Sequence, residues 1–464
     1  MKKVVVIGGG AAGCFAAIEI RRRHPDYEVT LLEAGPKLLA KVAITGGGRC
    51  NLTNTFASVT SLERIYPRGH QLMKRALRAF SQEDTMRWFE AEGVALVAQP
   101  DGCVFPRSQD AMQIVRTLER LLRTCNVTVQ CNAKVQSVIP SAAKESMNPA
   151  SAPEGCQFNG TPSLRSSGPS QNLLRPASQN SYLPGPSPCP CPGVDTSAEP
   201  TPSIRCGGGF SVATENTSYD ADVVLVTTGG SPKAAGLGFL ARLELEMLSP
   251  VPSLFTLRVA DAGLKALQGT LAEVQLSLAG TPFHADGTLL LTDWGISGPA
   301  TLRLSSYAAR YLAGQAYKGR LLINWLPGER DIPLLLKDLL SQNPKRLLSS
   351  VHPEGLTARL WAHLLAKAGL REDLRCAELG SKGAARLAAL LRSDEYALDG
   401  RVHFREEFVT CGGVSLSEIS LSTMEARRYP GLFFAGEVLD VDAITGGFNL
   451  QAAWSMASVA ARSI

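Results

Sequence analysis

Apolar and polar residues form blocks along the chain, and the first block is the most regular. An apolar run over residues 3–7 leads into a glycine-rich turn at 8–13, and a largely apolar stretch with helical spacing continues through Ile20. A second strand-like run covers 28–33, with Glu at both ends. A buried strand, a glycine turn, a helix and a second strand in this order predict one βαβ unit of a parallel sheet.

Later blocks predict two further kinds of structure. Strand-like runs over 251–325 predict an antiparallel sheet or a barrel, and helical spacing over 331–400 predicts a helical region. A short strand at 432–435 and a final helix from about Leu450 complete the pattern. We therefore expect an α/β protein with a β-rich part and a small helical part.

Residues 141–205 differ sharply from the rest in composition. The segment consists mainly of Ser, Pro, Asn and Gly and has almost no periodic apolar residues. Such a stretch buries too little surface to offset its ordering entropy, so it is predicted to be a disordered insertion. Strand-like runs flank it at 135–139 and 210–214, which makes it an overgrown hairpin loop whose removal the fold should tolerate.

Composition and charge exclude some classes of function. The net charge is only +5, and no uninterrupted basic block resembles a nucleic-acid-binding tail, so charge neither requires nor excludes RNA as a partner. The 11 cysteines contain no CxxC pair and the six histidines no HxH or HExxH spacing, so no metal site is predicted. The apolar run at 3–7 leaves no room for a signal peptide, and no run approaches a membrane span. We expect a soluble, cytoplasmic protein without a membrane partner.

The turn after the first strand carries a dinucleotide-binding pattern. Gly8, Gly10 and Gly13 form GxGxxG between a strand and a helix, which allows a tight turn, close backbone approach to a pyrophosphate and close helix packing. Glu33 ends the second strand about 20 residues after Gly13, where a carboxylate can accept both hydroxyls of a ribose. An acid at this position favours FAD or NAD over NADP.

A second signal, near the end of the chain, favours FAD over NAD. The apolar strand at 432–435 runs into Gly436-Glu437, and 226–230 has the sequence VTTGG. Both patterns resemble those of two-dinucleotide-binding flavoproteins, in which the acid lies near the ribityl and pyrophosphate part of the flavin. No second GxGxxG is present, so a nicotinamide donor would lack a standard Rossmann domain of its own.

Four ordered motifs together resemble one bacterial flavoprotein family, usually labelled aminoacetone-oxidase-like or NAD(P)/FAD-dependent oxidoreductase. They are 45–54 (TGGGRCNLTN), 291–300 (LTDWGISGPA), 409–414 (VTCGGV) and 436–451 (GEVLDVDAITGGFNLQ). The resemblance covers nearly the whole chain except the insertion. It implies FAD as cofactor and NAD(P)H as a possible electron donor. Similar proteins are associated with reducing a ring double bond in oxidised bile acids and with making dihydrouridine in ribosomal RNA.

The resemblance also implies a Rossmann-type FAD-binding domain of the two-dinucleotide-binding flavoprotein type, built from discontinuous segments. A β-rich domain and a small helical domain interrupt it. The predicted segments are 1–140 (FAD-binding, first part), 141–205 (low-complexity insertion), 206–250 (FAD-binding, second part), 251–330 (β-rich domain), 331–404 (helical domain) and 405–464 (FAD-binding, third part).

The cofactor site is expected to draw on these motifs. The glycine pair at 446–447 opens the last helix, whose N-terminus would face the pyrimidine end of the flavin. Asp440 and Asp442 are read as caps or as groups that support the binding residues. The predicted cofactor-binding residues are Gly8, Gly10, Ala11, Ala12, Gly13, Glu33, Ala34, Lys41, Gly47, Gly48, Arg49, Cys50, Asn51, Thr228, Gly229, Gly436, Glu437, Gly446, Gly447, Phe448, Asn449 and Leu450.

Two residues are candidates for catalysis. Reduction of a C=C bond conjugated to a carbonyl needs a hydride at the β-carbon, a proton at the α-carbon and a group that polarises the carbonyl. The thiol of Cys50 is a candidate proton donor because an ordinary thiol, with a pKa of about 8.5, is protonated at neutral pH. The alternative is that Cys50 only fills a small pocket. Asp293 is read either as a proton relay or carbonyl contact, or as a turn former that caps Ser297.

Four functions are consistent with these features. The leading one is an FAD-dependent reductase of a conjugated C=C bond in a small cyclic molecule such as a steroid. The others are uridine reduction in ribosomal RNA, amine oxidation with O₂, and a flavin-binding redox sensor without turnover. The expected partner is thus a small-molecule substrate or ribosomal RNA, and the sequence does not determine the oligomeric state.

Overall fold

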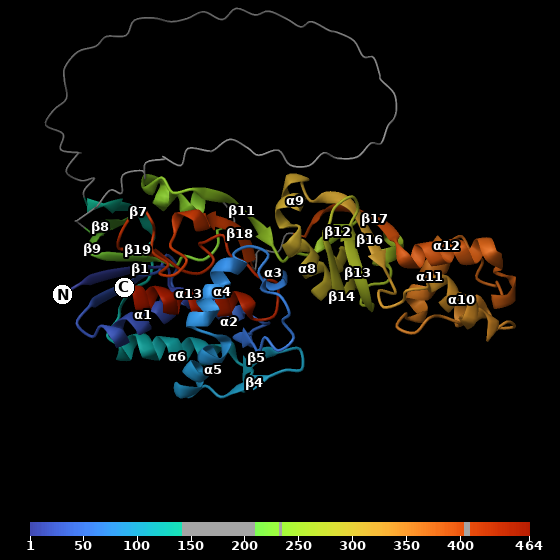
Figure 1. Cartoon of the computed structure of the whole chain (residues 1–464), viewed down its shortest axis with the longest axis horizontal. Helices are drawn as coiled ribbons and strands as arrows, with labels where there is room; N and C mark the ends of the chain where they lie inside the picture. Colours follow the sequence, from blue (N-terminus) through green and yellow to red (C-terminus); the bar gives the residue numbers. More distant parts are fainter. Residues whose placement is uncertain (142–208, 232–233, 403–408) are drawn as a thin grey trace, which may run out of the picture.

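The chain is described by a computed structural model that covers residues 1–141, 209–231, 234–402 and 409–464. A parallel five-stranded sheet in the order β19-β10-β1-β2-β6 forms its first layer (Figure 1). β1 is the central strand, and its residues 4–7 are all buried, as expected for a parallel strand that is covered on both faces. The strands are β1 (Lys3–Ile7), β2 (Glu28–Leu32), β6 (Thr128–Gln130), β10 (Val223–Val226) and β19 (Leu432–Phe434).

Helices cover this sheet, and two of them pack tightly together. α1 (Ala11–Arg23) contacts α13 (Phe448–Ser463), which is buried along almost its whole length. The small residues of α13 permit this close approach, and the ring of Phe15 packs 5.7 Å from that of Trp454. The other helices here are α2 (Ala40–Ile44), α3 (Leu62–Ile65), α4 (His70–Ala79), α5 (Gln82–Ala91) and α6 (Ala111–Thr124).

Three small antiparallel sheets complete this part of the molecule. The strands that flank the predicted insertion do pair as a hairpin, with Pro140 opposite Phe210, whereas 142–205 lies outside the described residues. The sheets are β3-β5-β4, β7-β8-β9 and β11-β18. Their elements are β3 (Thr53–Asn54), β4 (Leu96–Ala98), β5 (Cys103–Pro106), β7 (Val135–Pro140), β8 (Phe210–Thr214), β9 (Ser218–Ala221), β11 (Met247–Ser253) and β18 (Val409–Val414), with 3-10 helices η3 (Ala234–Leu243) and η6 (Leu416–Glu418) nearby.

The β-rich part is a closed barrel in the order β12-β15-β14-β13-β16-β17. Apolar side chains fill its core, among them Leu276, Leu289 and Ile323, all fully buried. α8 packs against β14 and β13. The elements are β12 (Leu257–Val259), β13 (Leu271–Leu278), β14 (His284–Thr292), β15 (Gly295–Ser297), β16 (Lys318–Asn324), β17 (Asp394–Arg401), α7 (Ala262–Lys265), α8 (Pro299–Tyr307) and α9 (Ala309–Gly314).

One sequence prediction is wrong here. Helical spacing was expected through residue 400, but 394–401 forms β17, which closes the barrel between β16 and β12. Asp394, Tyr396 and Leu398 are buried in strict alternation with exposed neighbours, which is the two-residue period of a strand. The helical part therefore interrupts the barrel between its last two strands. The domain boundaries given above stay predictions.

The helical part lies at the end of the molecule farthest from the parallel sheet (Figure 1). Its helices pack around the fully buried Trp361 and Leu360. Among the described residues, no helix is both long and apolar enough to cross a membrane. The elements are α10 (Ile332–Ser341), α11 (Ala358–Lys367) and α12 (Gly380–Arg392), with 3-10 helices η4 (Leu348–Ser350) and η5 (Cys376–Glu378).

Candidate functional site

The glycine turn between β1 and α1 has the geometry that the motif predicts. Gly8 has a φ of +108°, and a Cβ there would lie 2.6 Å from the carbonyl oxygen of Thr227. A Cβ on Gly13 would lie 1.9 Å from the carbonyl oxygen of Gly8. Only glycine fits both places, so α1 begins directly against β1 and β10. Its first N–H groups are then free of a side-chain cap at Gly10 and can bind phosphate oxygens.

Glu33 is held in place by the same turn. Its two carboxylate oxygens accept hydrogen bonds from the backbone N–H groups of Gly9 and Gly35, each at 2.7 Å. A carboxylate has about four acceptor positions, so two remain for hydroxyl groups. The side chain is half-buried at the end of β2 and lines the cavity described below. This geometry fits the predicted contact with a ribose.

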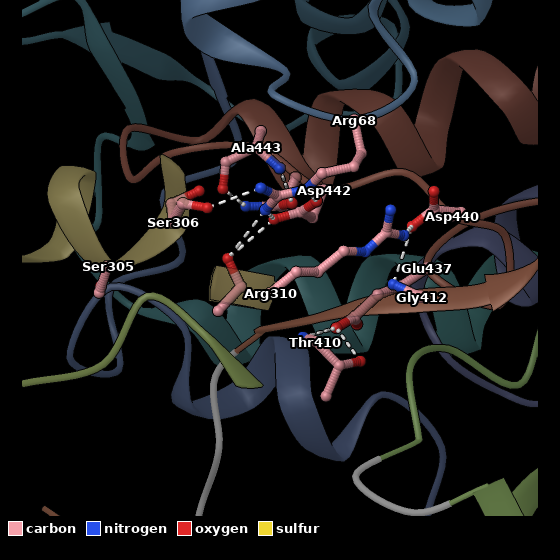
Figure 2. Close-up of polar contacts among 12 residues, drawn as sticks. Arg68, Ser305, Ser306, Arg310, Thr410, Gly412, Glu437, Asp440, Asp442 and Ala443 are labelled. Atoms are coloured by element: carbon pink, nitrogen blue, oxygen red, sulfur yellow. Dashed lines mark hydrogen bonds and ion pairs between the residues drawn. The ribbon is translucent and has the colours of Figure 1, made fainter. Parts of the chain in front are cut away.

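The second predicted acid, Glu437, follows β19 and also lines the cavity described below. Its Oε1 accepts from Thr410 N at 2.7 Å and from Thr410 Oγ1 at 3.2 Å (Figure 2). Lys41 Nζ lies 3.6 Å from Glu437 Oε2. Residues far apart in sequence, in the first and last thirds of the chain, are thus tied together across the site.

The N-terminus of α13 is fixed against the motif at 45–54. Gly447 caps the helix with a φ of +87°, and a Cβ there would lie 2.3 Å from the carbonyl oxygen of Thr53. Asn54 Nδ2 donates to the carbonyl of Gly446 at 3.0 Å. Asn449 makes two 2.9 Å hydrogen bonds to the backbone of Ala443, one through its Oδ1 and one through its Nδ2. Two of the four motifs recognised in the sequence therefore form one structural unit.

A cavity of about 890 Å³ connects these parts. It begins at the glycine turn, passes the α13 N-terminus and ends against the barrel. The predicted residues that line it are Gly8, Gly10, Ala11, Ala12, Glu33, Lys41, Gly47, Asn51, Thr228, Gly229, Gly436, Glu437, Gly446, Gly447, Asn449 and Leu450. The barrel side adds residues that were not predicted, namely Pro252, Ser253, Leu254, Phe255, Thr256, Ser297, Leu302, Arg401 and Val402.

Comparison with known proteins assigns a family. The model described as "HI0933-like protein Rossmann domain" matches residues 2–155 and 199–463. The chain belongs to the HI0933-like family. This confirms the predicted family and the α/β Rossmann fold class.

Two curated relatives match this HI0933-like protein over its full length. A 3-dehydro-bile acid delta(4,6)-reductase of Clostridium scindens is 25% identical over 480 residues, covering 100% of this chain and 99% of the relative. A ribosomal RNA dihydrouridine synthase of Escherichia coli is 28% identical over 460 residues, covering 99% and 97%. Among solved structures, a 3-ketosteroid delta1-dehydrogenase of Sterolibacterium denitrificans aligns with a TM-score of 0.46 and 11% identity, covering 100% and 99%.

Several predicted residues of this HI0933-like protein lie outside the cavity lining. The guanidinium of Arg49 stacks over the ring of Phe105 at 4.5 Å, and Asp293 is exposed in the turn between β14 and β15. Cys50 is fully buried, and burial raises the pKa of its thiol to about 12. The roles given to these residues stay predictions. The remaining predicted residues outside the lining are Gly13, Ala34, Gly48 and Phe448.

A buried ionic cluster beside the cavity was only partly foreseen from the sequence (Figure 2). Asp442, fully buried, accepts from Arg68 Nε at 2.5 Å and from its Nη2, and from Ser253 Oγ at 2.8 Å. Arg68 Nη1 also donates to the carbonyl of Ser306 in α8 at 2.6 Å. Asp442 thus supports the wall of the cavity at Ser253 rather than capping a helix. The position of Arg68 carries no motif, so only the fold reveals it.

Arg68 also fixes part of the cavity wall in this HI0933-like fold. A Cβ on Gly69 would lie 2.5 Å from Cγ2 of Val441, so this turn packs directly on the loop after Asp440. Val441 and Ile444 line the cavity, and Ile444 N donates to the carbonyl of Ile65 at 3.0 Å. The ion pair therefore holds the loop that leads to the α13 N-terminus.

Proposed function

We propose that this protein is an FAD-dependent reductase of a C=C bond conjugated to a carbonyl in a small cyclic substrate. The observation that carries the proposal is the continuous cavity whose lining extends from the dinucleotide turn to residues of the barrel. Its barrel side is lined mainly by apolar residues such as Leu254, Phe255, Leu302 and Val402. A largely apolar pocket with a few polar groups suits a small organic substrate. The bile acid reductase relative acts, by its name, on such a molecule.

The chain supplies the groups that an FAD needs. Gly8–Gly13 would face the pyrophosphate and Glu33 the ribose hydroxyls. The α13 N-terminus at Gly447 would face the pyrimidine end of the ring, where the positive end of the helix dipole stabilises negative charge. When bound and reduced, FAD would supply the hydride for the β-carbon of the substrate. We further propose NAD(P)H as the electron donor.

Cys50 and Asp293 stay the proposed groups for proton delivery and carbonyl contact. Burial raises the pKa of the Cys50 thiol to about 12, so the thiol is protonated at neutral pH but is a weaker acid than an ordinary thiol. Proton delivery by a positioned side chain contributes about 10²–10⁴-fold to a rate. If Cys50 is the donor, Cys50→Ala lowers kcat at least about 100-fold and retains FAD. If it only fills space, kcat stays within a few-fold of the native value while stability falls.

An absorbance spectrum of the purified protein is the first test. We expect a flavin spectrum, FAD on denaturation, and anaerobic bleaching by NADH or NADPH. A conjugated 3-oxo steroid should then restore the oxidised spectrum and yield the product reduced at the C=C bond. A protein that binds no FAD, or a reduced protein that only O₂ reoxidises, would contradict the reductase assignment. Hydrogen peroxide release with an amine would instead favour an amine oxidase.

A second candidate is uridine reduction in ribosomal RNA. It is favoured by relatives of that name in Escherichia coli and Haemophilus influenzae, 28% and 27% identical over nearly the full chain. Uridine also contains a C=C bond conjugated to a carbonyl, so the same site chemistry applies. The reduced protein would be incubated with unmodified ribosomal RNA, and dihydrouridine measured by nucleoside mass spectrometry. Dihydrouridine without steroid turnover would replace the first proposal with this one.

A further inference from the structure

Two residues with hydroxyl groups lie next to each other where the barrel borders the cavity. Thr256 directly precedes β12, Ser297 ends β15, and both line the cavity. β12 and β15 are antiparallel, with Leu257 opposite Ile296. Continued by one residue, this register puts Thr256 opposite Ser297. The Cβ atoms of residues that oppose each other in this way are about 4.5–5.5 Å apart, so the two side chains are neighbours.

Strand alternation turns both side chains away from the barrel core. Leu257 and Ile296 are fully buried in that core. Successive side chains of a strand point to opposite faces. The positions next to them, Thr256 and Ser297, therefore face outward, where both residues line the cavity. The pairing of β12 with β15 thus places two hydroxyl-bearing side chains together on the cavity wall.

Neither hydroxyl has a partner in the described part of the protein. Thr256 is 7% exposed, and its buried Oγ1 makes no hydrogen bond. Ser297 is partly buried and accepts from Thr301 Oγ1 through its carbonyl, but its own Oγ has no partner among the described residues. A third hydroxyl of the same wall, that of Ser253, is by contrast bound to Asp442 at 2.8 Å.

The missing partners point to a ligand atom. Buried hydroxyls in native proteins are normally hydrogen-bonded, so an unpartnered one beside a cavity has room for an acceptor from outside the chain. A threonine exchanges the places of its hydroxyl and methyl groups by rotation about χ1. No hydrogen bond holds the Oγ1 of Thr256 where it is, so this rotation can bring it to a ligand that also binds Ser297.

Two neighbouring O–H donors in an apolar wall suit an oxygen that gains negative charge. Leu254, Phe255 and Leu302 line the same side of the cavity, and their side chains offer no competing polar group. Hydrogen bonds to a developing charge are worth more in such surroundings than in water. The acceptor that matches this wall is therefore an oxygen whose charge grows during the reaction.

The electron count of the proposed reduction identifies that oxygen. A hydride from the reduced flavin forms a C–H bond at the β-carbon of the substrate. The electron pair of the C=C bond then moves toward the carbonyl, which becomes an enolate with its negative charge largely on oxygen. A proton added at the α-carbon restores the carbonyl. The substrate thus gains one hydride and one proton, and the hydride donor loses two electrons. Donors that bind the enolate oxygen more tightly than the carbonyl oxygen lower the barrier.

We propose that the hydroxyls of Thr256 and Ser297 donate hydrogen bonds to the carbonyl oxygen of the substrate and stabilise the enolate. This inference rests on the proposed reductase function and assigns the group that polarises the carbonyl. Asp293, the other candidate for this contact, is exposed in the turn before β15 and does not line the cavity.

The first experiment measures reduction of the substrate apart from reduction of the flavin. Dithionite-reduced holoenzyme is mixed anaerobically with a conjugated 3-oxo steroid, and the return of the oxidised flavin spectrum gives the rate. Removal of one donor to a developing oxyanion typically costs about 10²–10³-fold, so Ser297→Ala and Thr256→Val should each lower the rate at saturating steroid at least about tenfold. A rate within about twofold of the native value in either variant would overturn the proposal.

Three further variants control for packing, for loss of any hydroxyl and for the competing residue. Thr256→Ser keeps the hydroxyl and should stay within about threefold of the native rate, whereas a loss as large as in Thr256→Val would overturn the proposal. Ser277→Ala removes a partly exposed hydroxyl of β13 outside the cavity lining and should have no effect. A loss in Asp293→Asn without one in Ser297→Ala would assign the contact to Asp293 and overturn the proposal.

Measurements without substrate distinguish contact with the substrate from contact with the cofactor. FAD affinity, the absorbance spectrum of the bound flavin and the rate of its reduction by dithionite should be equal in native protein, Ser297→Ala and Thr256→Val. These readouts do not depend on turnover. Weaker FAD binding or a shifted flavin spectrum in both variants would mean that the hydroxyls bind the cofactor, and would overturn the proposal.

Binding of para-nitrophenol separates this proposal from the proposed function. Its phenolate oxygen mimics the enolate, and the phenol and phenolate absorb at different wavelengths, so a titration with oxidised holoenzyme gives the pKa of the bound phenol. Native protein should lower this pKa below its value in water, and both variants should lower it less. That result without turnover of any enone supports the oxyanion site and contradicts the reductase function. Enone turnover with the same rate and the same phenol pKa in all three proteins contradicts the site and leaves the function intact.

Discussion

Two buried ion pairs join parts of this molecule, and they differ in what they support. At the cavity, Asp442 is fully buried and is bound by Arg68 and Ser253. At the joint between the barrel and the helical part, Asp394 is also fully buried. It accepts from Lys367 Nζ at 2.5 Å, from Trp325 Nε1 at 3.0 Å and from the Tyr396 hydroxyl at 2.8 Å.

The local chemistry of the two clusters is similar, but their surroundings are not. Ser253 and Val441, which contact or adjoin the Arg68–Asp442 pair, line the cavity. Lys367, Asp394 and their partners do not line it. A buried ion pair adds little net stability over an apolar pair, but removing one partner leaves a charge buried without compensation. Removing the cation should therefore lower both stability and ligand binding at the Arg68–Asp442 pair. At the Lys367–Asp394 pair it should lower stability alone.

The largest effect is expected from Arg68→Met. Among the described residues, it leaves Asp442 with only the Ser253 hydroxyl as a side-chain donor, and we expect a loss of about 3–5 kcal/mol in the free energy of unfolding. Because the loop after Asp440 loses its anchor, FAD should also bind at least about tenfold more weakly. Denaturant unfolding of the FAD-free protein and fluorescence titration with FAD measure the two effects separately. Unchanged FAD affinity in a folded variant would refute the link between this pair and the cavity.

Lys367→Met is the matched substitution at the Lys367–Asp394 pair, between the barrel and the helical part. Asp394 keeps two neutral donors, Trp325 and Tyr396, and Lys367 is partly exposed, so we expect a smaller loss of about 1–3 kcal/mol. FAD affinity and the rate of substrate reduction should stay within about twofold of the native values. The same unfolding curves and titrations apply. A fall in FAD affinity as large as that in Arg68→Met would erase the contrast between the two clusters.

The sequence predicted the elements of the dinucleotide site because their signals are local. Gly8 to Gly13 and Glu33 lie within one βαβ unit, and strand, turn and helix each leave a periodic pattern. Arg68, Thr256 and Arg401 carry no such signal, because what brings them to the cavity is pairing between distant segments. β17 was missed for a related reason: its alternating pattern follows directly on α12 and contains Asp394, a charge that only a tertiary partner allows in a buried strand position.

A smaller effect is expected at Arg310, whose Nη2 lies 2.6 Å from Asp440 Oδ1. Asp440 neighbours Asp442 in sequence, but Arg310 is 46% exposed and Asp440 keeps a hydrogen bond from Gly412 N at 2.9 Å. Arg310→Met should therefore cost about 1 kcal/mol or less in the free energy of unfolding. The loss should shrink further at high salt, because exposed pairs are screened. Urea unfolding at two salt concentrations checks both statements, and a salt-independent loss above 3 kcal/mol would contradict them.

The smallest effect concerns pH at the helical joint. His363 Nε2 lies 3.3 Å from the Tyr396 hydroxyl, and burial lowers the pKa of His363 below its ordinary value although Asp261 and Asp394 oppose this and Lys367 adds to it. Between the lowered pKa and the ordinary value near 6.5, the unfolded chain binds more protons, so stability falls as the pH drops through this window.

The measurement is the melting temperature of native protein and His363→Gln between pH 7.5 and 5.5. Many groups titrate over this range, so the difference between the two proteins isolates His363. Native protein should lose roughly 1–2 °C more than the variant on acidification, because the half-exposed imidazole titrates at modest cost. FAD affinity of both proteins should follow the same pH curve, because the residue adjoins the Asp394 cluster and not the cavity. If native protein and His363→Gln differed only in FAD affinity, the Asp394 cluster would support ligand binding and not stability alone, contrary to the role assigned to it.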